Sequence, residues 1–135
     1  MNDKEIFNKL KADHPIDEMV KFNELTISDE IQKNDGLCVK YRDLYHRALG
    51  ESDKLSDLYD KLAGKRYKHY RFEADEGWTK VEIEKYCLPQ DVKIMKFKKI
   101  IRRQQIKVRF FEMCWKAFEG RKWSMKMFME TLKGY

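Results

Sequence analysis

A segment of alternating cations and aromatic rings is the part of this 135-residue sequence best suited to chemistry. From Lys61 to Arg71 there are five Lys or Arg residues and no acid. Lysine and arginine contact phosphates, and exposed bases stack on aromatic rings at about 1–3 kcal/mol each. The pattern therefore predicts binding of single-stranded nucleic acid through Lys61, Lys65, Arg66, Tyr67, Lys68, His69, Tyr70 and Arg71.

The same rings also fit a purely structural interpretation. Tyr67, Tyr70 and Phe72 can continue an apolar stripe that begins at Leu58 and Leu62, with the cations facing water. In that case phosphate contacts would remain available to the cations, but base stacking would not. Both interpretations stay open from the sequence.

A second set of cations lies between residues 92 and 111, where eight Lys or Arg residues occur without an acid. Lys96, Lys99, Arg103 and Lys107 are spaced so that they share one side of a helix. We expect this stripe to contact phosphates as well. The competing hypothesis pairs these cations with the acidic first sixty residues of a neighbouring subunit.

The net charge of +6 is unevenly distributed along the chain. Residues 1–60 carry 9 basic and 14 acidic side chains (−5), whereas residues 61–135 carry 20 and 9 (+11). The basic half, residues 61–135, attracts polyanions, which makes nucleic acid the leading class of partner. The sequence has no apolar run near the roughly 18–20 residues needed to span a bilayer and no secretory signal. We therefore expect a cytoplasmic protein without a membrane partner.

Catalytic and metal-binding patterns are not evident in the sequence. His14, His46 and His69 are scattered, and no cysteine lies at ligand spacing from any of them. The Gly64-Lys65 pair does not complete a phosphate loop, because residue 66 is Arg where Ser or Thr is needed. The prediction is a protein that is not an enzyme and has no cofactor and no metal site.

The elements that position these residues are predicted to be helical, giving an all-α fold. A short helix ends at His14-Pro15 and a second one follows. Asn34-Asp35-Gly36 is a turn signal, and the helix predicted over 37–49 ends at Gly50. Another helix, beginning at Ser52 or Asp53 and running toward residue 71, would form an antiparallel hairpin with it. Residues 73–88 are predicted as a short extended segment or a surface helix.

A long amphipathic helix is predicted after Pro89. Its apolar positions recur at alternating spacings of three and four, which is typical of helix packing seams. A second stripe formed by Ile106, Phe110, Met113 and Ala117 widens the apolar surface. We expect a monomer of this size to be too small to bury both apolar faces of the helix. A last helix is predicted after Gly120. We therefore infer packing between subunits, with burial against residues 37–71 of the same chain as the alternative. The predicted interface consists of Ile94, Phe97, Ile101, Gln104, Val108, Phe111, Trp115, Phe118, Trp123 and Met127.

The domain prediction is a single helical domain over 1–135. It has a helical N-terminal region, 1–88, that contains the basic-aromatic segment 61–72, and oligomerising C-terminal helices over 89–135.

The order of these features resembles UvsY-type recombination mediator proteins of tailed bacteriophages. The resemblance covers nearly the whole chain and is most specific where Arg121-Lys122-Trp123-Ser124-Met125-Lys126 follows the long helix. The family's DNA-contacting cations precede a tandem tyrosine, whose place is taken here by His69-Tyr70. The other matching pieces are Asp13-His14-Pro15-Ile16-Asp17, Leu37-Cys38-Val39-Lys40-Tyr41, Leu58-Tyr59, and Gln105-Ile106-Lys107-Val108-Arg109-Phe110-Phe111-Glu112.

The resemblance implies an all-helical mediator that acts without ATP and forms a homo-oligomer, a heptameric ring in the family. Such a protein binds single-stranded DNA, helps displace single-strand-binding protein and loads a RecA-like recombinase in phage homologous recombination, repair and replication. Its place would be the cytoplasm of the infected host bacterium. Two alternatives stay open: a general architectural or duplex DNA-binding protein, and an interaction adaptor that does not bind DNA.

Overall fold

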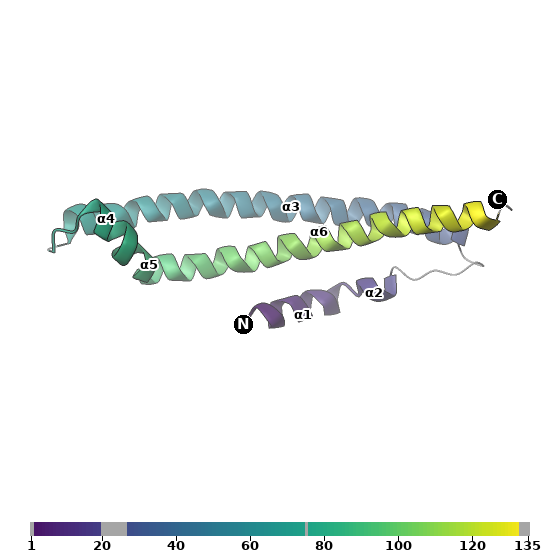
Figure 1. The fold of residues 1–135 in the computed structure, drawn as a ribbon, viewed down its shortest axis with the longest axis horizontal. Helices are drawn as coiled ribbons and strands as arrows, with labels where there is room; N and C mark the ends of the chain where they lie inside the picture. Colours follow the sequence, from purple (N-terminus) through teal and green to yellow (C-terminus); the bar gives the residue numbers. More distant parts are fainter. Residues whose placement is uncertain (1, 20–26, 75, 133–135) are drawn as a thin grey trace. The chain divides into compact units, whose positions relative to one another are not determined.

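The computed structural model describes residues 2–19, 27–74 and 76–132, which contain helices and no strand (Figure 1). The all-α prediction is confirmed. The chain divides into two units, unit 1 (1–49 and 106–135) and unit 2 (50–105). The elements are α1 (Asp3–Asp13), α2 (Ile16–Met19), α3 (Ile27–Lys68), the π-helical turn η2 (His69–Glu73), α4 (Lys80–Glu82), the π-helical turn η3 (Ile83–Cys87), α5 (Leu88–Gln90) and α6 (Val92–Leu132).

The two N-terminal helices agree with the prediction. The side chain of Asn2 accepts a hydrogen bond from the Glu5 backbone amide at 2.9 Å, and the Glu5 carboxylate accepts one from the Asn2 amide, so the first turn of α1 is capped. His14 ends α1 just before Pro15, as expected for a residue that precedes proline. The short helix α2 follows.

The long helix α3 runs without interruption through residues 27–68, so the predicted turn at Asn34-Asp35-Gly36 and the predicted helix end at Gly50 are wrong. A helical hairpin of 37–49 against 52–71 is therefore wrong as well. Glycine inside a helix costs only about 1 kcal/mol relative to alanine. Burial of Tyr41 and Ala48 outweighs that cost, since each is at most 4% exposed.

The core of unit 1 is formed where residues 27–49 of α3 pack against residues 106–132 of α6. Tyr41 stacks on Phe118 with 5.2 Å between ring centroids, and Trp115 stacks on Tyr45 at 5.7 Å. The buried members of this core are Cys38, Tyr41, Ala48, Phe110, Phe111, Cys114 and Phe118.

In unit 1, α1 packs on part of the second apolar stripe of α6, around Phe110. Phe7 meets Phe110 edge to face at 5.9 Å, and the His14 ring lies 5.4 Å from that of Phe111. Leu10 and Ile16 also pack on this core. The short N-terminal helices therefore cover part of this stripe, while Met113 stays 47% exposed, and packing between subunits stays a prediction.

A helical hairpin is present inside unit 2, and its arms are residues 50–68 of α3 and residues 92–105 of α6 (Figure 1). The connection contains η2, a short irregular stretch and the helical turns over 80–90, so the surface-helix alternative is confirmed for that second part. Thr79 caps these turns by accepting from the Glu82 amide, and Ile83 and Cys87 are buried beneath them.

The C-terminal helix α6 is 41 residues long and continues through Gly120, so the separate last helix predicted there is wrong. Arg121, which directly follows the glycine, is only 4% exposed and donates to Glu30 on α3 at 2.7 Å. Within unit 1, this ion pair joins the last turns of α6 to α3, and Met125 is buried nearby on α6.

Candidate nucleic-acid interface

Asp91 is the centre of a buried polar cluster that ties the basic-aromatic segment to the start of α6. Its carboxylate, 4% exposed, accepts from the Arg66 Nε at 2.8 Å and from the Tyr70 hydroxyl at 2.6 Å. The other oxygen accepts from the Ile94 backbone amide at 3.0 Å, which caps the first turn of α6. The cluster therefore fixes the last turns of α3 against the first turn of α6 within unit 2.

The charges of this cluster stabilise one another. Burial alone would raise the pKa of Asp91, but hydrogen bonds from Tyr70, from the Ile94 amide and from Arg66 outweigh it, so its pKa lies below the ordinary value. The hydrogen bond to Asp91 raises the pKa of Tyr70, and it likewise raises the pKa of Arg66. Near neutral pH the cluster is therefore an ion pair with a neutral phenol beside it.

Two residues predicted to bind nucleic acid thus have internal partners. The Arg66 guanidinium lies 5.4 Å from the centre of the Tyr70 ring as well as on Asp91, so one face of that ring is covered. This arrangement matches the structural interpretation of Tyr70 better than base stacking. Tyr67 is half-buried too.

Among the remaining residues of the segment, the His69 side chain is half-buried and the others described next are exposed. The His69 ring lies 3.2 Å from the Glu73 carboxylate, and Arg71 donates to the Trp78 carbonyl at 3.0 Å while staying exposed. Phe72 is 76% exposed, which makes its ring accessible to a base, although the sequence prediction did not include it among the binding residues. The exposed cations are Lys61, Lys65, Lys68 and Arg71.

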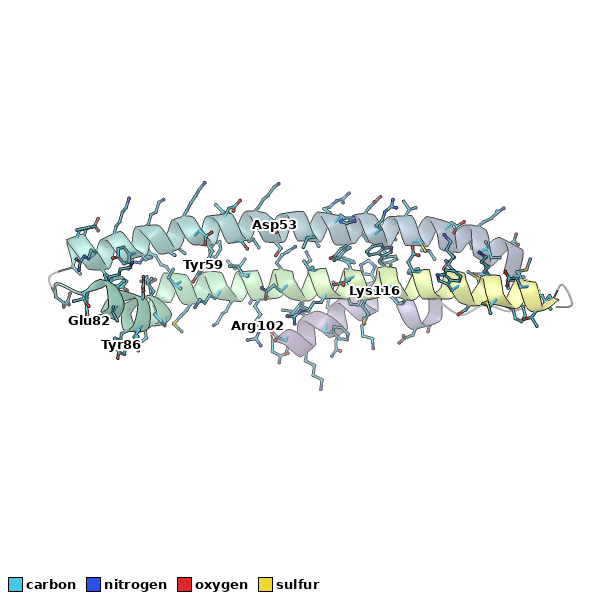
Figure 2. All side chains as sticks on the ribbon, turned by 45° about the horizontal axis from the view of Figure 1, so that its top comes forward. Asp53, Tyr59, Glu82, Tyr86, Arg102 and Lys116 are labelled. Atoms are coloured by element: carbon cyan, nitrogen blue, oxygen red, sulfur yellow. The ribbon has the colours of Figure 1, made fainter. Side chains whose placement is uncertain are left out.

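The cationic stripe of α6 lies mostly in unit 2. Lys96, Lys99 and Arg103 are exposed there, whereas Lys107 is exposed in unit 1. All Lys and Arg residues of 92–105 are exposed, and that range has no acid. Figure 2 shows Tyr59 between α3 and α6 and Arg102 on the other side of α6.

The predicted interface seam faces α3 of the same chain in both units. In unit 2, the ring centroids of Phe97 and Tyr59 are 6.1 Å apart, and the Gln104 amide donates to the Glu51 carboxylate at 3.2 Å. Ile94 is buried there and Ile101 is half-buried.

In unit 1 the rest of the seam belongs to the core. Phe111 and Phe118 are buried, and Val108 and Trp115 pack against them. In each unit the seam residues from Ile94 to Phe118 thus face α3 of the same chain, which is the alternative to packing between subunits. It leaves Trp123 and Met127, at 64% and 60% exposed, on the surface of α6.

Asp91 and Phe72 are the residues that the sequence prediction of the site missed. Pro89-Gln90-Asp91 was a usable signal for the start of the helix, but the pairing of Asp91 with Arg66 joins positions 25 residues apart. Nothing in the local sequence specifies that pairing. For Phe72, the signal was its place at the end of the segment, where helical periodicity did not decide between core and surface.

Metal and membrane features are not found in the described residues. No group of three or more His, Cys, Asp or Glu side chains in the described ranges can hold a metal ion. In the same part of the chain, no helix has the length and apolarity needed to cross a bilayer. Burial raises the pKa of the Cys114 thiol to about 12 and also raises those of Cys38 and Cys87, so these cysteines are protonated, unreactive thiols.

Comparison with models of protein families finds no match, and neither does comparison with curated proteins or with solved structures.

Proposed function

We propose that this protein is a recombination mediator that binds single-stranded DNA, helps displace single-strand-binding protein and loads a RecA-like recombinase. In this proposal it acts in phage homologous recombination and repair, in the cytoplasm of the infected bacterium. It acts without catalysing a reaction itself and without a cofactor. The resemblance of the sequence to UvsY-type mediators supplies the class, and the surface of unit 2 supplies the physical support.

The observation that carries the proposal is the concentration of exposed cations in unit 2. The α6 arm presents only basic charges along 92–105, and the end of the α3 arm adds Lys61, Lys65 and Lys68. Each cation that neutralises a phosphate releases counterions, so binding of this kind depends steeply on salt and little on sequence. This is the binding mode that a protein acting on arbitrary single strands requires.

Assembly into a homo-oligomer, a heptameric ring by resemblance, would strengthen this binding. Each subunit adds its own set of weak phosphate contacts, and linked contacts raise the effective concentration of the strand. The exposed apolar side chains of the C-terminal turns of α6, Trp123 and Met127, are the surface that assembly through this helix would cover.

Oligonucleotide binding at two salt concentrations tests the proposal directly. The variant Lys65→Gln/Lys68→Gln removes two exposed cations without touching the Asp91 cluster, and we expect weaker binding of labelled oligo(dT) with a flatter salt dependence. The matched control is Lys80→Gln/Lys85→Gln, which removes two exposed cations elsewhere in unit 2. Equal effects of the two variants would contradict this assignment of the site.

The mediator role requires a second measurement. The protein should restore the DNA-dependent ATPase of a RecA-like recombinase on strands coated with single-strand-binding protein. Stronger binding of duplex than of single strands at matched salt would favour an architectural protein instead. No binding of either at about 0.1 M salt would favour an adaptor.

A further inference from the structure

Phe72 is the most exposed of the large apolar side chains that the structure describes. It lies in unit 2, in the π-helical turn η2, and it is 76% exposed. A single exposed apolar side chain is ordinary on a protein surface. What this ring can bind is therefore decided by the groups around it.

The groups next to Phe72 along the helix are cations. Lys68 lies four residues before it, which places the two side chains close together on the helix surface, and Lys65 lies one turn further back. Both lysines are exposed. Arg71 is exposed too, and its guanidinium donates to the Trp78 carbonyl at 3.0 Å. Residues 61–72 contain no acid, so an open ring stands beside three positive charges.

The other rings of the basic-aromatic segment are less accessible. One face of the Tyr70 ring is covered by the Arg66 guanidinium, 5.4 Å from the ring centre. His69 is half-buried and meets Tyr70 edge to face, with 5.2 Å between the ring centroids. Tyr67 is also half-buried. Among the aromatic side chains from Tyr67 to Phe72, only that of Phe72 is exposed.

The backbone that carries Phe72 is anchored within unit 2. Two residues earlier, the Tyr70 hydroxyl donates to the buried Asp91 carboxylate at 2.6 Å. Two residues later, the Ala74 amide donates to the His69 carbonyl at 2.9 Å and closes the π-helical turn. A ring on an anchored backbone loses less conformational freedom when a ligand binds.

We propose that Phe72 stacks on a base of bound single-stranded DNA, while Lys65, Lys68 and Arg71 contact the neighbouring phosphates. The inference rests on the proposed function and adds a base contact to it. Stacking on an aromatic side chain tolerates any base, and it needs the unstacked bases that a single strand offers and a duplex does not. The other occupant that an exposed ring can have is an apolar surface of a second copy, and the experiment below separates the two.

The test uses the full chain, labelled oligo(dT), and an abasic oligonucleotide of the same length, which has the phosphates but no bases. The variant Phe72→Leu keeps an apolar side chain without a ring, and it should bind oligo(dT) at least about fivefold more weakly. Its salt dependence should match the wild type, because no phosphate contact is lost. Phe72→Tyr keeps the ring and should bind like the wild type. The matched control is Tyr86→Leu, at another exposed ring of unit 2, and it should also leave binding unchanged.

The abasic strand supplies the second measurement. The wild type should bind it more weakly than oligo(dT), and Phe72→Leu should reduce that difference. If the wild type binds both strands equally, or if Phe72→Leu binds oligo(dT) like the wild type, the inference is overturned and the proposed function stands. If the wild type binds no oligonucleotide, both are overturned. A lower mass of Phe72→Leu by light scattering would place the ring at a contact between subunits and would also overturn the inference.

Discussion

Asp91 is a buried carboxylate whose oxygens take hydrogen bonds from three donors in unit 2. Such a group is stable only while its partners are in place, because an unpaired buried charge is costly. The residue therefore holds one cation of the basic-aromatic segment inward. Arg66 is held inward on Asp91, and Lys65 and Lys68 are left exposed.

Replacing Asp91 by Asn should destabilise the protein by about 3 kcal/mol at neutral pH. The amide can still accept from Ile94, but the Arg66 charge loses its partner. Chemical denaturation followed by circular dichroism measures this loss. The control Asp53→Asn, at an exposed position of α3, should change stability by less than about 0.5 kcal/mol.

The same cluster has a defined pH dependence. Because the folded pKa of Asp91 lies below its ordinary value of 3.8, its stabilisation is present above that pH and is lost as the pH falls through 3.8 toward the folded pKa. The Asp91→Asn variant should lack this part of the acid transition. An identical acid profile for variant and wild type would show that the cluster is not formed in solution.

His14 gives unit 1 a pH dependence at milder acidity. Burial, then the charge of Lys40, lower the pKa of His14, with Asp13 opposing them. Its Nδ1 lies 2.9 Å from the Tyr41 hydroxyl, and the ring also faces Phe111. Protonation would place a charge among these rings, so stability should be full above pH 6.5 and fall as the pH drops below it.

Thermal melts across this pH range test the His14 prediction. The His14→Asn variant should lose the pH dependence, at some cost in stability, because Asn does not titrate. His46→Asn changes an exposed histidine in the same unit and should leave the pH dependence in place. If the wild type melts at the same temperature at pH 7.5 and at about pH 5.5, the prediction fails.

At the scale of elements, local signals predicted helix but not where helices end. His14-Pro15 marked a helix end correctly because a proline ring clashes with the residue before it and disfavours the α conformation there. Gly36, Gly50 and Gly120 were not, since glycine only lowers helix stability and long apolar seams outweigh it. The pairing of α3 with α6 and the covering role of α1 depend on contacts between residues far apart in sequence, which single-sequence patterns do not specify.

The glycines inside α3 make a testable case. A Cβ added at Gly36 would meet no atom within 4 Å, and its φ is not positive. Gly36→Ala should therefore stabilise the protein by about 1 kcal/mol, by relieving the conformational-entropy cost of glycine. Differential scanning calorimetry would show this as a higher melting temperature.

Gly77 supplies the opposite control for the glycine prediction. Its φ of +63° is costly for a residue with a Cβ, although the space around it is open. Gly77→Ala should lower stability by about 1 kcal/mol. If Gly36→Ala were also destabilising, the added methyl group must disturb a contact that this structure does not contain, such as one with another molecule.

At the scale of the whole molecule, the charge of the site was the one property that the sequence could predict. The acidic and basic halves and the exposed cations of α6 follow from composition and period. The inward role of Arg66, and the burial of Phe111 and Phe118 in the chain's own core, do not. This matters for assembly, because a charge placed at Phe111 would unfold unit 1 rather than only separate subunits.

Assembly is therefore best tested at the exposed apolar residues of the last turns of α6. The variant Trp123→Asp/Met127→Asp alters side chains that are 64% and 60% exposed, so helicity and melting temperature should stay near wild type while the mass in solution drops toward that of one chain. Light scattering measures the mass, and Val81→Asp, at a residue 57% exposed in unit 2, is the matched control. Because multivalent contacts add, the variant should also bind oligo(dT) more weakly. An unchanged mass would mean that subunits meet elsewhere, and a monomeric wild type would remove assembly from the proposed mechanism.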